Sequence, residues 1–160
     1  MTSIAQIITR LDRGGSAEIV MELSEKLQKR GFSITLVTGR TVNAQRSIDQ
    51  FVKVSGVSFY YVEKLVRELN PLKDVCAFFS ILKIIKKVKP MIVHTHSSKA
   101  GIIGRAAAYA AGVPYIIHSP HGHIFYGYYG GALSFFFIFL ERIAAKCTRR
   151  IVTLTESGML

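Results

Sequence analysis

Three histidines and two glycines lie close together in the segment IIHSPHGHIFYG, at 116–127. Histidine titrates near neutral pH, so its ring can exchange a proton with a hydroxyl group of a bound substrate. His118 and His121 are candidates for this role, and Gly122 allows a ligand to approach the backbone closely. The segment therefore predicts a polar cleft that handles hydroxyl groups, such as those of a sugar.

A metal site is the alternative interpretation of these residues. All five histidines of the chain fall at 94–123, and neutral imidazole is a good zinc ligand. A catalytic metal centre usually also contains a carboxylate, but neither histidine-rich segment, HTHSSKAG or HSPHGHIFYG, contains Asp or Glu. We therefore expect no metal ion, and a histidine-rich metallohydrolase is the less favoured alternative.

The segment HTHSSKAG, at 94–101, adds a second group of candidates. His94 and His96 are two residues apart on an expected strand, which places them on the same face. Ser97 leads into a helix whose first turn holds Lys99. A lysine there opposes the helix dipole, which hints at an anionic ligand. A core histidine bonded to backbone explains His94 equally well.

Gly14 and Gly15 lie between the first expected strand and the first expected helix. Such glycines let a phosphate oxygen approach the unpaired N–H groups at a helix N-terminus. The pattern is not GxGxxG, so a dinucleotide fingerprint is absent. A plain tight turn would use the two glycines equally well.

Strands and helices alternate along the chain, and the strands are near-continuous apolar runs. This pattern predicts an α/β fold with a doubly wound, mostly parallel, Rossmann-like sheet. Ser16 is expected to cap the first helix and Gly31 to end it. A polar linker is expected between the second and third strands. The expected strands are 3–8, 32–39, 57–62, 91–96, 114–119 and 150–157, and the expected helices are 16–30, 72–88, 98–112 and 132–147.

The order of these elements has a functional consequence. In open parallel sheets, ligands bind beyond the carboxyl ends of the strands. The turn RLDRGG and both histidine-rich segments follow expected strands. These three turns should therefore converge in space.

The net charge of +11 over 160 residues permits contact with nucleic acid, an anionic membrane or a phosphorylated substrate. The aromatic helix at 132–147 could touch a membrane together with Lys83, Lys86, Lys87 and Lys89. Aromatic and basic residues are not interleaved, so we expect no nucleic-acid partner. No apolar run reaches the roughly 20 residues of a spanning helix. We also see no signal peptide, and expect a cytoplasmic protein, peripheral at the membrane.

The chain resembles the N-terminal half of a GT-B glycosyltransferase of retaining family 4, in the form found in bacterial enzymes that build surface polysaccharides. The resemblance rests on four segments in order: the early GG, VHTHSSKAGIIGR, AGVPYIIHSPHG and LERIAAKCTRRIVTLTES. It implies that residues 1–160 form the acceptor-side domain. The implied reaction transfers a sugar from a nucleotide-sugar to an acceptor hydroxyl, with retention and without a metal or other cofactor.

The resemblance also assigns roles to individual residues. His121 matches the histidine that faces the donor sugar, which makes it the candidate catalytic residue. Gly14 and Gly15 match the loop near the donor phosphates, and Glu156 lies at the cleft edge. The remaining substrate-binding candidates are His94, Ser97, Lys99, His118 and Gly122.

The sequence departs from the family in one large respect, since the C-terminal, donor-binding domain is missing from these residues. We therefore expect that domain as a partner, together with a nucleotide-sugar, a lipid-linked acceptor and an anionic membrane surface. The chain alone should have little transferase activity. A non-catalytic module that binds an anionic lipid or glycan is the other alternative.

Overall fold

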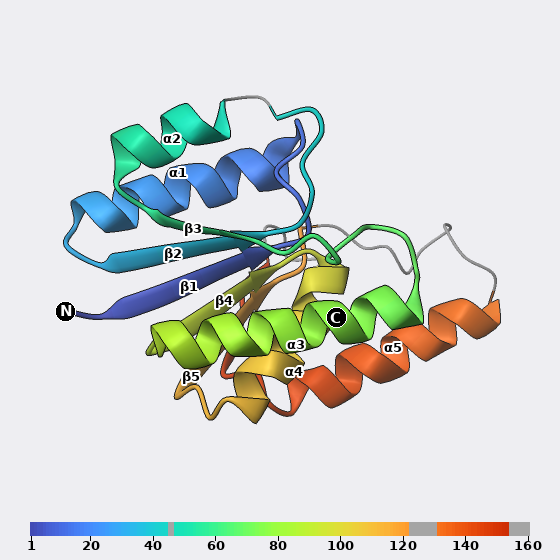
Figure 1. Cartoon of the computed structure of the whole chain (residues 1–160). Coiled ribbons are helices and arrows are strands. Elements are labelled where there is room, and N and C mark those ends of the chain that lie inside the picture. Colours follow the sequence, from blue (N-terminus) through green and yellow to red (C-terminus); the bar gives the residue numbers. More distant parts are fainter. Residues whose placement is uncertain (45–46, 122–130, 154–160) are drawn as a thin grey trace.

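The computed structural model describes residues 1–44, 47–121 and 131–153, with side chains of α5 described only in part (Figure 1). Helices and strands alternate as the sequence predicts. In order, the elements are β1 (Ser3–Ile8), α1 (Gly15–Lys29), β2 (Ser33–Thr38), α2 (Ile48–Ser55), β3 (Ser58–Tyr61), α3 (Pro71–Val88), β4 (Ile92–His96), α4 (Ser98–Ala110), β5 (Tyr115–Ser119), α5 (Gly131–Ala145) and β6 (Arg150–Ile151).

The six strands form one sheet in the order β3-β2-β1-β4-β5-β6, and every pairing is parallel. The chain runs outward from β1 to β3 and then returns to β4, on the other side of β1. The direction of winding thus reverses between β1 and β4. This confirms the doubly wound, Rossmann-like α/β fold, and it places the switch point beside the first histidine-rich segment.

Helices cover both faces of the sheet (Figure 1). On one face, α1 and α2 bury a core with β1 and β2, and on the other α3 and α4 bury a larger core. Helix α4 also packs against both α3 and α5. Among the described residues, no helix has both the length and the apolar character needed to cross a bilayer.

Helix α4 lies close to the sheet because two glycines face it. A Cβ on Gly101 would lie 2.4 Å from the His118 ring, and one on Gly104 would lie 2.8 Å from a methyl group of Thr95. Real Cβ atoms do not approach other atoms this closely. The close packing of α4 on the sheet therefore requires glycine at these two positions.

The structure corrects three details of the sequence prediction. The supposed polar linker contains α2, whose N-cap Ser47 accepts a hydrogen bond from Gln50 N and whose Phe51 is buried. Helix α1 starts at Gly15 with Gly14 as N-cap and without a side-chain capping bond, so the predicted cap at Ser16 is wrong. The last strand ends at Ile151, short of the predicted span 150–157. Residues 154–157 of that span lie outside the described residues.

Candidate functional site

The ends of β1, β4 and β5 meet at the carboxyl edge of the sheet. Ser97, just after β4, donates its backbone N–H to the carbonyl of Ser119 at the end of β5, with an N···O distance of 3.1 Å. The hydroxyl of Ser97 lies 2.8 Å from that of Thr9, which follows β1. The starts of the three predicted turns therefore converge at this edge.

Three histidine rings lie together at this edge. The ring centroids of His94 and His96 are 4.0 Å apart, and those of His96 and His121 are 5.1 Å apart and stacked. The first pair confirms that His94 and His96 share one face of β4. Hydrogen bonds fix the rings further. His94 Nε2 lies 2.9 Å from Ser119 Oγ, and His96 Nδ1 lies 2.8 Å from His121 Nε2.

The buried rings have lowered pKa values. Burial, with a smaller contribution from nearby His121, lowers the pKa of His94 to about 4. Burial also lowers the pKa of His96 and of His121. These rings are therefore neutral at pH 7, and each has one N–H donor and one acceptor nitrogen.

His118 lies on the opposite face from this cluster. Its side chain is 2% exposed, its Nδ1 lies 3.0 Å from Thr95 Oγ1, and its ring faces Gly101 of α4. Burial, and then the nearby Arg105 guanidinium, lower its pKa to about 3. The structure therefore does not bring His118 together with His94, His96 and His121.

Lys99 already has an anionic partner and a carbonyl acceptor within the chain. Its Nζ lies 2.7 Å from Asp74 Oδ1 and also donates to the carbonyl of Glu68. The apparent mismatch with the helix dipole is thus compensated by α3 and the loop before it. The lysine does not need an external anion in this conformation.

Gly14 and Gly15 differ in what they require. Gly14 has φ 156° and ψ 159°, a conformation that is essentially restricted to glycine. Gly15 opens α1, and a Cβ there would meet no atom within 4 Å. Packing therefore does not explain Gly15, and the open space beside it is compatible with the approach of a ligand. Gly122 and Glu156 lie outside the described residues.

Ser97 has a strained backbone at the centre of the edge. Its φ of 65° and ψ of 158° fall in a region that is essentially populated only by glycine. The serine is held there by the bonds to Ser119 and Thr9 already described. Strain of this kind concentrates at functional sites, so Ser97 stays a candidate site residue.

Sequence analysis missed two residues that organise this edge. Gln6 is fully buried on β1, and its Oε1 lies 2.6 Å from His96 Nε2. Thr9 contacts Ser97 and also accepts a hydrogen bond from Ala100 N at 3.2 Å. A glutamine inside the apolar run SIAQII was the available signal, because a polar side chain in a buried strand needs a polar partner.

The histidine cluster is built for hydrogen bonding more than for metal coordination. Both ring nitrogens of His96 have hydrogen-bond partners. Within the described part of the chain, no three His, Cys, Asp or Glu side chains gather as a set of metal ligands.

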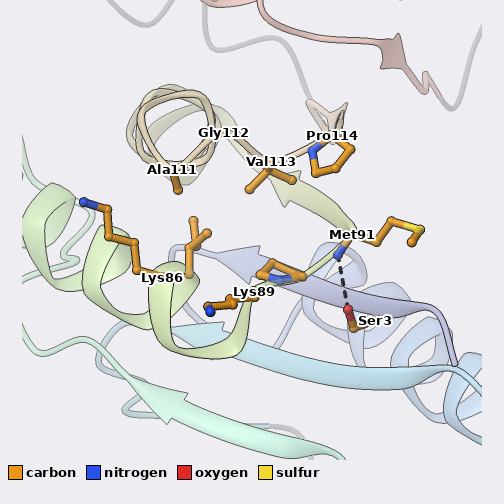
Figure 2. A pocket seen from close by; sticks show the side chains of 10 residues that line it. Ser3, Lys86, Lys89, Met91, Ala111, Gly112, Val113 and Pro114 are labelled. Carbon is orange, nitrogen blue, oxygen red and sulfur yellow. Dashed lines mark hydrogen bonds between the residues drawn. The ribbon is translucent and has the colours of Figure 1, made fainter.

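A separate pocket lies at the opposite, amino edge of the sheet (Figure 2). Lys86 and Lys89 of the α3 end line it, with Ser3, Met91 and the 111–114 turn. The hydroxyl of Ser3 accepts a hydrogen bond from Met91 N at 3.2 Å. No histidine lines this pocket, so it is separate from the candidate site.

Residues 14–159 match the family described as "Glycosyl transferase 4-like domain". The chain belongs to this family. Over 140 residues it is 35% identical to an Escherichia coli UDP-Gal:alpha-D-GlcNAc-diphosphoundecaprenol alpha-1,3-galactosyltransferase. The match covers 88% of this chain and 35% of that enzyme, so the chain spans about a third of its relative.

Solved structures agree on the fold. MurG from Acinetobacter baumannii superposes with a TM-score of 0.68 at 13% identity, over 97% of this chain and 42% of MurG. Sucrose-phosphate synthase from Thermosynechococcus elongatus superposes with a TM-score of 0.69 at 13% identity, over 94% of this chain and 42% of the synthase. The UDP-GlcNAc 2-epimerase from Neisseria meningitidis superposes with a TM-score of 0.67 at 15% identity, over 99% of this chain and 42% of the epimerase. The likeness shows the GT-B type of fold, which transferases and epimerases share.

Proposed function

We propose that the chain is the acceptor-side domain of a retaining glycosyltransferase that transfers a sugar from a nucleotide-sugar to an acceptor hydroxyl. The main support is the cluster of His94, His96 and His121 at the carboxyl edge of the sheet, where the winding reverses between β1 and β4. The chain also belongs to the glycosyl transferase 4-like family. His121 is the proposed catalytic residue, beside the donor sugar. The reaction requires no metal ion in this proposal.

The substrate class follows from the relative. That enzyme's name specifies a UDP-sugar donor and an acceptor sugar carried on diphosphoundecaprenol. We infer that this chain also serves a lipid-linked acceptor in the synthesis of a surface glycan. Gly14 and Gly15 are proposed to lie near the donor phosphates, and His94 and Ser97 near the acceptor.

A second domain is part of the proposal. The chain spans 35% of the relative's length, and one Rossmann-like domain supplies only one wall of a GT-B site. We propose that a C-terminal domain binds the nucleotide and closes on the histidine edge. The chain alone then has little transferase activity.

Helices α3 and α5 support peripheral binding to a membrane. Both lie on the same side of the sheet (Figure 1) and expose large apolar side chains: Leu72, Val75 and Phe79 on α3, and Phe135 and Phe139 on α5. Exposed Lys83 and Lys86 continue the α3 stripe. Each basic residue near an anionic bilayer contributes about 1 kcal/mol. We propose that this surface brings the site to its lipid-linked acceptor.

A reconstitution assay tests the proposed function. The chain is co-expressed with the adjoining downstream coding region, and membranes are assayed with UDP-sugars and a lipid-diphosphate-linked acceptor. His121→Ala should abolish most turnover, whereas Lys53→Ala on the exposed surface of α2 should not change it. Turnover that survives His121→Ala would refute the catalytic assignment. Absence of turnover with every donor, combined with vesicle binding, would favour a non-catalytic lipid-binding module.

A further inference from the structure

A continuous path of hydrogen bonds leads from the middle of the sheet to His121. The buried Gln6 of β1 reaches His96 with an Oε1···Nε2 distance of 2.6 Å. The other ring nitrogen of His96, Nδ1, lies 2.8 Å from His121 Nε2. The three side chains come from β1, the end of β4 and the residue that follows Pro120 after β5.

The donors and acceptors along this path can be assigned in order. An amide oxygen only accepts, so His96 Nε2 carries the hydrogen that Gln6 Oε1 accepts. Because the ring is neutral, His96 Nδ1 is then an acceptor. His121 Nε2 must therefore donate to it, which leaves His121 Nδ1 unprotonated.

The far end of the path has no internal partner. His121 Nδ1 is buried and lacks a hydrogen-bond partner among the described residues. A buried, unpaired acceptor opposes folding, so it needs an explanation. His121 also has a left-handed backbone, with φ 53°, which is uncommon for a residue other than glycine. A hydroxyl group of a ligand, donating to Nδ1, would complete the network.

We propose that Gln6 and His96 are positioning residues that hold His121 in the tautomer with Nε2 protonated and Nδ1 free to accept a proton from a substrate hydroxyl. The role in sugar transfer rests on the proposed function, whereas the tautomer does not. The ring of His94 lies beside that of His96, with centroids 4.0 Å apart and the two planes tilted by 42°, and it closes the other side of the His96 ring. Gln6 thus acts on His121 without contacting it, because the side chain of His96 lies between them.

The tautomers can be read directly in the chain itself. Long-range ¹H–¹⁵N correlation spectra of protein labelled with ¹⁵N-histidine distinguish protonated from unprotonated ring nitrogens, and single substitutions assign the five histidines. We expect His96 and His121 both in the Nε2–H form at pH 7.5. A His121 with Nδ1 protonated would mean that the path runs in the opposite direction, and would overturn the proposal.

Gln6→Met tests the cause of this preference. Methionine keeps the length and burial of the side chain but removes the acceptor, so both rings should become mixtures of tautomers. Gln28→Met is the matched control, because Gln28 Oε1 accepts one hydrogen bond, from Ile34 N at 2.9 Å, far from the histidines. If Gln6→Met does not fold, Gln6→Asn shortens the side chain and provides the same test. Unchanged tautomers in a folded variant would refute the role of Gln6.

Kinetics test whether the tautomer matters for the reaction. In the chain combined with its donor-binding domain, Gln6→Met should lower kcat about tenfold or more while changing KM little, because a misassigned tautomer impairs proton transfer and not binding. Gln28→Met should leave kcat unchanged. An unchanged kcat with altered tautomers would remove the positioning role. A wild type without turnover would refute the proposed function and leave the spectroscopic result intact.

Discussion

The side-chain oxygens of Thr9 and Ser97 lie 2.8 Å apart and join the end of β1 to the N-cap of α4. Ser97 occupies a glycine-like conformation in this position, with φ 65°. Replacement by alanine removes the hydrogen bond and keeps the strain, whereas replacement by glycine removes both. We therefore predict that Ser97→Gly is more stable than Ser97→Ala, by about 1–2 kcal/mol. Urea denaturation of the two variants measures this difference. Equal stabilities would show that the residue is not strained in solution.

Gly101→Ala should destabilise the fold strongly. The new methyl group would lie 2.4 Å from the buried His118 ring, and α4 cannot retreat without losing its contacts with the sheet. We expect a loss of about 2 kcal/mol or more in the free energy of unfolding, as for overpacking in other cores. In a double-mutant cycle, His118→Ala provides space for the methyl group. The two changes together should then cost less than the sum of their separate effects. If the losses of stability in the two single variants simply add up in the double variant, residues 101 and 118 do not interact as described.

Gly15→Ala separates stability from ligand binding. A Cβ at this position meets nothing within 4 Å, and alanine is a better helix former than glycine, so the free energy of unfolding should stay the same or rise by up to about 1 kcal/mol. If donor phosphates approach α1 here, the same change should weaken nucleotide-sugar binding in the two-domain enzyme. Thermal unfolding and calorimetric titration with a UDP-sugar measure the two effects. Unchanged affinity would remove Gly15 from the site.

Membrane binding should depend on the stripe on α3. The double variant Val75→Ser, Phe79→Ser removes two exposed apolar side chains and should reduce partitioning to anionic vesicles by about tenfold or more. Neither side chain is in the core, so stability should change little. Val54→Ser is the matched control, since Val54 is 73% exposed on α2, which covers the other face of the sheet. Equal losses in both variants would show that the stripe has no special role.

The sequence predicted every strand and every helix except α2, and the edge at which the site forms, because apolar runs and glycine-bounded helices are local signals. It did not predict pairings between distant residues. Lys99 hinted at an external anion, but Asp74 compensates its charge from α3. His118 and His121 look equivalent in the sequence, yet His118 lies on the face of β5 that packs against α4. The alternation of side chains along β5 places His118, whereas His121 lies beyond the end of that strand, where its left-handed backbone with φ 53° accompanies the contact with His96. Gln6 gains its importance only from the ring of His96 beside it.

Stability should fall when the pH is lowered from 7.5 to 5. Burial lowers the pKa of His94 to about 4 and that of His118 to about 3, whereas both titrate near 6.5 in the unfolded chain. Above pH 6.5 neither state binds these protons, and the stabilisation is fully present. Below pH 6.5 the unfolded chain binds protons that the folded chain excludes, so each such histidine destabilises the fold by up to about 1.4 kcal/mol per pH unit. The loss continues down to the folded pKa.

Urea midpoints at pH 7.5 and 5 measure this effect before most carboxylates titrate. His94→Gln should show a smaller difference between the two midpoints than the wild type, because it removes one group that is neutral only when folded. Arg30→Gln, on the exposed end of α1, should leave the difference unchanged. Equal midpoints at both pH values in the wild type would show that the histidines are accessible to protons in the folded chain, and the neutral hydrogen-bonded cluster would then be wrong.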